Sequence, residues 1–328
     1  MGIEKNRLAA IDILKGIGIV LVVLGHTVHN ELNAWIYTFH MPLFFIVAGL
    51  FLKPGNDVYL KRLKSMLIPY FIFAFITYPY WRFVEMRFRP LPDGFDANAH
   101  FFDIFWQTNE FMFNAVLWFL PCLFITIVLL NFILTIVKNR YAIICLCLAW
   151  IVAATLYIPD TQSYWIKETW VAFPFVTIGW ILGNSLSRIE NKLTTIPWYF
   201  KIIALIPLIA VFFIPHGGSM MTAECPIGYV YFFALAFVCV TAVYILSTML
   251  TSQKWLSWLG RNTLVIMCLH EPLKRIVIKV FSTLTHQSTD ELRESVILSI
   301  LVTAVVILAL VPVCKLINKR MQWILGRF

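Results

Sequence analysis

The stretch IDILKGIGIVLVVLGHTVH, residues 11–29, is long enough and apolar enough to cross a membrane as one helix. A helix needs about 20 predominantly apolar residues to span the hydrocarbon core, because it rises about 1.5 Å per residue. Only helices and closed barrels satisfy their backbone polar groups in lipid, and a barrel strand would alternate in polarity. This stretch does not alternate, so it predicts a membrane-spanning α-helix.

Apolar blocks of this kind recur along the whole chain. Hydrophobic residues make up 60% and charged residues 13% of the 328 positions, whereas a soluble domain has about 45–50% apolar and about 25% charged residues. We therefore predict an all-α, polytopic membrane helix bundle that forms a single domain over residues 1–328. About ten spans are expected, near residues 11–29, 35–52, 66–83, 115–137, 141–158, 169–186, 198–214, 227–249, 263–280 and 295–317.

The distribution of Lys and Arg predicts the orientation. If the N-terminus is cytoplasmic, most basic residues fall in cytoplasmic segments, as the positive-inside rule requires. Ten spans then return the C-terminus to the cytoplasm and place residues 84–112 outside. The net charge of +9 follows from this topology, and the basic residues are scattered over short loops, so we do not predict nucleic-acid binding.

The first span carries ionisable side chains, which are costly in a membrane and mark functional sites. Lys15 and His26 are eleven residues apart, so a helix that turns about 100° per residue places them on one face, about 16 Å apart along the axis. Asp12 and His29 extend the same stripe. We expect Asp12 to pair with Lys15 rather than with His26. Structural alternatives are an interfacial ion pair for Asp12 and Lys15, and a hydrogen-bonded packing role or a proton relay for His26.

The next segments add further candidates. His40 lies fourteen residues after His26, near the outer end of the second span, so the two imidazoles are expected to approach each other across a hairpin. Ala48 and Gly49 on that span permit close helix packing. A cytoplasmic loop then carries a basic cluster that includes Arg62 and Lys64. Cations of this kind bind phosphate, although the positive-inside bias alone also accounts for them.

Two later segments carry weaker signals. Trp118 lies in the tract Leu117–Leu120 at the start of the fourth span, and such tracts are common in membrane helices. His270 and Glu271 lie in the ninth span, just before Pro272. A buried carboxylate needs a partner to stay charged.

In this order, these segments resemble the integral-membrane acyltransferase-3 family, and in particular its fucose 4-O-acetylase-like branch. The resemblance rests on Asp12–Gly16 with His26, on Phe39–Phe45 with Gly49, on Leu67–Tyr70, on Leu117–Leu120, on Phe175–Gly179 and on Leu259–His270. It covers most of the chain. Lys15 departs from the family pattern, where arginine is usual, and lysine lacks the bidentate guanidinium fork.

The resemblance implies an enzyme that transfers acyl groups other than aminoacyl groups. Its donor would be acetyl-CoA from the cytoplasm, and its acceptor a hydroxyl of a cell-surface or lipid-linked carbohydrate. It implies a multi-pass protein of the cell membrane, namely the bacterial inner membrane, surrounded by lipid and needing no metal. His26 and His40 would be catalytic. Lys15, Arg62 and Lys64 would bind CoA, with Asp12, Trp118, His270 and Glu271 in support.

Other readings remain open at this point. A transporter or flippase would use the same polar stripe as a pathway without covalent chemistry, and an assembly subunit of an envelope complex would use only the spans. Transfer through an acyl-histidine and direct transfer are both compatible with the residues. The sequence predicts neither the acceptor sugar nor the oligomeric state.

Overall fold

The computed structural model describes residues 2–88, 96–107, 112–158 and 164–327, and over these ranges it is built from helices, with one isolated bridge between Ser219 and Glu224 and no strand. The helices are α1 (Gly2–Thr27), α2 (Glu31–Tyr37), α3 (His40–Leu50), α4 (Asp57–Arg62), η1 (Leu63–Leu67), α5 (Ile68–Phe83), η2 (Glu85–Arg87), α6 (Ala97–Trp106), η3 (Ala115–Trp118), α7 (Phe119–Ile136), α8 (Arg140–Leu156), α9 (Tyr164–Gly183), α10 (Leu186–Thr195), α11 (Trp198–Ile203), α12 (Ile206–Ala210), η4 (Val211–Phe213), α13 (Tyr229–Met249), α14 (Lys254–Arg261), α15 (Thr263–Thr285), α16 (Thr289–Glu294), α17 (Val296–Arg320) and η5 (Gln322–Leu325).

The predicted all-α class is confirmed for the described residues. Five segments are long and apolar enough to cross a membrane, namely Ala9–Thr27, Glu31–Leu50, Ala115–Ile136, Tyr229–Met249 and Val296–Arg320. A sixth would join α9 and α10, which are bent by 70° at their junction. The chain is therefore a multi-pass membrane protein by the length and composition of its helices. The count of ten spans and the orientation stay predictions.

Two predicted segments differ from the structure. The expected span 198–214 is split into α11, α12 and η4. Pro207 lies in the first turn of α12, where its missing N–H is tolerated, whereas in the interior of one long helix it would remove a hydrogen bond. The expected outer loop 84–112 contains η2 and α6. Its residues 89–95 and 108–111 lie outside the described residues.

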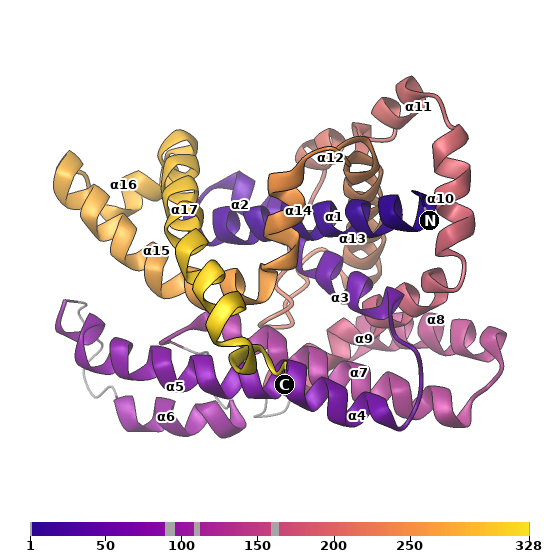
Figure 1. Cartoon of the computed structure of the whole chain (residues 1–328), viewed down its shortest axis with the longest axis horizontal. Helices are drawn as coiled ribbons and strands as arrows, with labels where there is room; N and C mark the ends of the chain where they lie inside the picture. The colour runs from indigo at the N-terminus through magenta and orange to yellow at the C-terminus, as the bar shows by residue number, and fades with distance from the viewer. Residues whose placement is uncertain (1, 89–95, 108–111, 159–163, 328) are drawn as a thin grey trace.

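Helix α1 lies at the centre of the bundle and packs against α3, α13, α14, α15 and α17 (Figure 1). One of these neighbours, α14, approaches α1 at two glycines. A Cβ on Gly260 of α14 would overlap the carbonyl oxygen of Asp12, and one on Gly16 would overlap that of Leu256. Close approach of this kind is typical of small residues in membrane helices. It fixes α14, and the start of α15 behind it, against the Lys15 end of α1.

Helices α3 and α9 also approach each other closely at glycines. A Cβ on Gly49 would overlap the carbonyl oxygen of Val176, and a Cβ on Gly179 would overlap that of Ile46. The predicted close helix approach at Gly49 is therefore confirmed. Since α3 begins at His40, this crossing also fixes one of the candidate site residues.

We predict that Gly179→Ala destabilises the protein, because a backbone carbonyl cannot move aside as a side chain can. Overpacking costs about 1–3 kcal/mol, more than the helix propensity that alanine gains, about 1 kcal/mol. Thermal unfolding in detergent measures the effect. Ala304→Val on the exposed face of α17 is the control, and equal melting temperatures for the two variants would contradict this account of the crossing.

The topology is tested with a single cysteine at Asn98, an exposed residue of α6. We expect a membrane-impermeant maleimide to label Asn98→Cys in intact cells, because residues 84–112 are predicted to face outward. The parent protein, with its seven native cysteines, gives the background. Labelling that requires membrane disruption would reverse the orientation.

Candidate active site

The site is built around the C-terminal end of α1, which lies inside the bundle. The last carbonyls of a helix have no partner within it. Lys274 donates its ammonium to the His26 carbonyl at 2.8 Å, and Arg293 donates to the carbonyls of Thr27 at 3.1 Å and His26 at 3.4 Å. Two cations therefore cap α1, which also matches the negative end of its dipole.

The carboxylate of Glu271 binds one of these cations, Lys274, and also a third cation, Arg275. It accepts hydrogen bonds from Lys274 at 2.9 and 2.8 Å and from Arg275 Nε at 3.1 Å. Arg275 reaches on to Glu85, at 2.9 and 3.1 Å. Glu271 and Lys274 are both 6% exposed. The partner that a buried Glu271 requires is thus supplied by the residues three and four positions later on α15.

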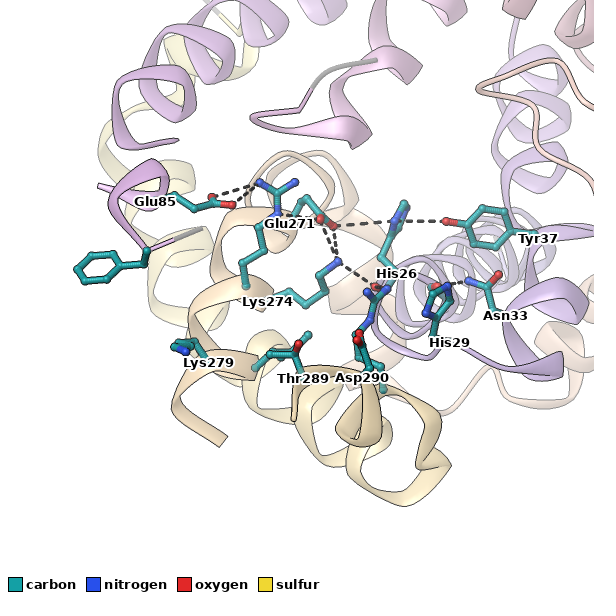
Figure 2. A pocket seen from close by; sticks show the side chains of 15 residues that line it. His26, His29, Asn33, Tyr37, Glu85, Glu271, Lys274, Lys279, Thr289 and Asp290 are labelled. Carbon is teal, nitrogen blue, oxygen red and sulfur yellow. Dashed lines mark hydrogen bonds and ion pairs between the residues drawn. The ribbon is translucent and has the colours of Figure 1, made fainter. Parts of the chain in front are cut away.

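The imidazole of His26 lies between Glu271 and Tyr37, as Figure 2 shows. Its Nδ1 is 3.9 Å from Glu271 Oε2 and 3.4 Å from the Tyr37 hydroxyl. Its side chain is 18% exposed, so the ring is within reach of a ligand. A partly open imidazole beside a carboxylate has the setting of a general base.

Two further histidines surround this ring. The His270 ring is centred 5.4 Å from that of His26, and the His40 ring is centred 4.8 Å from that of Tyr37. In both, Nδ1 is 2.8 Å from a backbone carbonyl, which can only accept a hydrogen bond. Each Nδ1 therefore carries the proton, and Nε2 is left as an acceptor. The Nε2 of His270 is buried without a hydrogen-bond partner.

A large polar pocket opens on the Glu271 side of His26. Its volume is about 730 Å³, which is in the range of small-molecule sites. Figure 2 shows Glu85, Lys279, Thr289 and Asp290 around its far side. The residues that line it are Gly25, His26, His29, Asn33, Tyr37, Glu85, Phe88, Glu271, Lys274, Arg275, Ile278, Lys279, Thr289, Asp290 and Arg293.

A much smaller cavity, of about 30 Å³, lies on the other side of the same ring. His26 and Tyr37 line both spaces. His40 and Trp118 line the small one, so the structure brings these sequence candidates together there. Tyr37 stands between His26 and His40, with ring centroids 5.9 and 4.8 Å away, respectively. The expected approach of the two imidazoles is therefore bridged by a tyrosine.

A third pocket, of about 710 Å³, lies at the Lys15 end of α1 and is strongly basic. Among the residues that the structure describes, its lining holds no acidic side chain and consists of Lys15, Trp258, Arg261, Asn262, Lys315, Asn318, Lys319 and Arg327. Lys15 pairs with Asp12 at 2.8 Å, as predicted, and Arg261 approaches the same carboxylate at 3.5 Å. The lining also holds Lys315, Lys319 and Arg327, and cations of this kind bind phosphate.

Two of the predicted CoA ligands lie beside this pocket rather than in it. Arg62 is half-buried and Lys64 is exposed, and neither is in the lining. The carbonyl of Lys64 packs on Gly326, directly before Arg327. The sequence could not show that the C-terminal segment, through Lys315, Lys319 and Arg327, supplies the cations instead.

The predicted stripe on the first helix also ends earlier than expected. Helix α1 stops at Thr27, because the backbone N–H of His29 donates to the Arg293 carbonyl at 2.8 Å instead of continuing the helix. His29 still lines the large pocket. The residues that sequence reasoning left out of the site are Tyr37, Glu85, Lys274, Arg275 and Arg293. The spacing of Lys274 and Arg275 from Glu271, three and four residues, was the signal available for two of them.

No group of three or more His, Cys, Asp or Glu side chains within the described ranges is placed to hold a metal ion.

A family model for an acyltransferase domain matches residues 8–318, nearly the whole chain. No curated protein and no solved structure matches the chain. The match covers α1 from residue 8 onward, the histidine cluster, and the basic pocket except Lys319 and Arg327. The chain therefore belongs to the acyltransferase-3 family and is a membrane acyltransferase.

Proposed function

We propose that the chain transfers an acetyl group from cytoplasmic acetyl-CoA to a hydroxyl of a cell-surface or lipid-linked carbohydrate, in the manner of the fucose 4-O-acetylase-like branch and in a bacterial inner membrane. The observation that supports this most is the arrangement along α1. A basic pocket lies at one end, a polar pocket lies at the other, and His26 borders the second.

The basic pocket suits the donor. The phosphates of CoA would bind among Lys15, Lys315 and Lys319, because ammonium groups form charge-assisted hydrogen bonds with phosphate. Helices α1 and α15 both run from this pocket to the histidine cluster, from Lys15 to His26 and from Asn262 to His270. The separation along α1 is about 16 Å, a distance that the pantetheine arm can bridge.

The polar pocket suits a carbohydrate, whose hydroxyls need donors and acceptors. His26 would remove the proton of the acceptor hydroxyl as its oxygen attacks the thioester carbonyl. The new C–O ester bond forms, the C–S bond breaks, and the CoA thiolate takes the proton from the imidazolium. Proton transfer by a positioned base is worth about 10²–10⁴-fold in rate.

The function is tested with purified protein in proteoliposomes supplied with [acetyl-¹⁴C]CoA and extracted surface glycans. We expect radiolabel in the glycan together with release of free CoA thiol. A transporter or flippase would leave acetyl-CoA intact, so glycan movement without CoA release would favour that alternative.

We predict that His26→Ala and His26→Gln both lower acetyl transfer by at least about 10²-fold. The amide of glutamine can keep a packing hydrogen bond but cannot take the proton. The carbonyl of residue 26, which Lys274 and Arg293 cap, is unchanged in both variants, so the bundle should fold. The measurement is the initial rate of radiolabel transfer.

The thermal unfolding of both His26 variants and their binding of CoA serve as controls, since the phosphate contacts lie at the other end of α1. Wild-type transfer by His26→Gln would make His26 a packing residue and would refute this mechanism.

The donor site makes a separate prediction. Lys315→Ala with Lys319→Ala should raise the KM for acetyl-CoA about tenfold, equivalent to about 1.4 kcal/mol, with little change in kcat. Such a pattern indicates loss of binding that is equal in the ground and transition states. Steady-state kinetics with thiol detection measures it.

Two matched double variants test whether the change in KM arises from the basic pocket. Lys138→Ala with Arg140→Ala removes two exposed cations that do not line the pocket, and should leave the KM unchanged. Arg62→Ala with Lys64→Ala tests the loop that the sequence favoured, and should have the smaller effect. A larger KM change in that loop variant would return the phosphate site to the loop.

A further inference from the structure

The small cavity beside His26 is closed by a hairpin from another part of the chain. Ser219 and Glu224 exchange backbone hydrogen bonds at 2.8 and 2.9 Å, and Met220 and Met221 lie at the turn between them. Met220 is 3% exposed, although the hairpin is part of a connection between helices. Methionine is a flexible side chain that fills irregular gaps.

The hairpin is attached to the element that carries Tyr37. The backbone N–H of Gly217 donates to the buried Thr38 hydroxyl at 2.9 Å. Gly217 has φ of +100° and Gly218 has φ of +152°, conformations that favour glycine. Trp35 of α2 stacks on Phe212 at 5.1 Å and donates to the Leu208 carbonyl at 2.7 Å. The methionines are thus placed by contacts that the segment before the hairpin makes with α2 and Thr38.

The cavity is small and largely apolar. Its volume is about 30 Å³, and its lining includes Met41, Trp118, Met220 and Met221 beside the histidines. A water molecule needs about 10–15 Å³, so the space fits a group of only a few atoms. An acetyl group, with two carbons and one oxygen, is of this size.

We propose that this cavity receives the acyl group of the donor, and that Met220 and Met221 limit its length to acetyl. The inference rests on the proposed function and adds the residues that select the acyl chain. His26 and Tyr37 line both the large and the small space. An acyl group held in the small cavity would therefore lie beside the same imidazole and phenol that border the acceptor pocket, with its thioester carbonyl turned toward that pocket.

The test compares acetyl-, propionyl- and butyryl-CoA with the wild-type chain and with Met221→Ala, in proteoliposomes with extracted glycans. The readouts are release of CoA thiol and mass of the acylated glycan. For the wild type we expect kcat/KM to fall steeply with acyl length. Met221→Ala should raise the butyryl to acetyl ratio at least about tenfold, because truncation leaves a cavity where the side chain was.

Three variants make the result specific. Met221→Leu keeps the volume and should keep the wild-type preference. Met249→Ala makes the same truncation at the end of α13, outside the cavity lining, and should not change the ratio. Met220→Ala should act like Met221→Ala. Because Met220 is the more deeply buried, Met221→Ala decides the outcome if the Met220 variant fails to fold.

An unchanged butyryl to acetyl ratio in folded Met221→Ala, with active wild type, would overturn the acyl-length assignment and leave the proposed function standing. Absence of CoA release by the wild type with all three donors would overturn both.

Discussion

The rest of the site depends on one constraint, which is that α1 ends inside the bundle. The last carbonyls of a helix have no partner within it, and a buried carbonyl left without a hydrogen bond costs about 1–3 kcal/mol. Lys274 and Arg293 satisfy them at 2.8 to 3.4 Å. The two cations come from α15 and α16, so capping α1 also fixes these helices around His26. His26, the proposed base, therefore lies at the point where three helices are joined.

The sequence was sufficient where a pattern is local to one helix. The apolar length of residues 11–29 predicted α1, the three-residue spacing predicted the pair of Asp12 with Lys15, and the small side chain of Gly49 predicted a close crossing. Each depends on helical periodicity alone, which is regular over a few turns. Helical periodicity also predicts that Lys15 and His26 share one face of α1. In the structure Lys15 borders the basic pocket and His26 borders the large polar pocket.

The features that the sequence did not predict depend on contacts between segments that are far apart in the chain. Arg293 reaches α1 across more than 260 residues of chain, and no local pattern marks it. Lys315 and Lys319 looked like ordinary positive-inside residues, because their role depends on how α17 packs beside Lys15. The segment 198–214 had a span-like composition, but Pro207 divides it. The hairpin at Met220 and Met221 carries no chemical signal at all, since methionine is typical of any apolar core.

The centre of this membrane protein holds a network of four charged side chains. A buried ion pair is often no more stabilising than apolar side chains of similar volume, because desolvation offsets the attraction. Glu85, Glu271, Lys274 and Arg275 are therefore poorly explained by stability alone. Within this group of four, two carboxylates face two cations, so Lys274 can cap α1 while its own charge is compensated by Glu271. Removal of one of these side chains would leave its partner buried without a counter-charge. The pairing therefore holds Glu271 close to His26, where a carboxylate would stabilise an imidazolium as it forms.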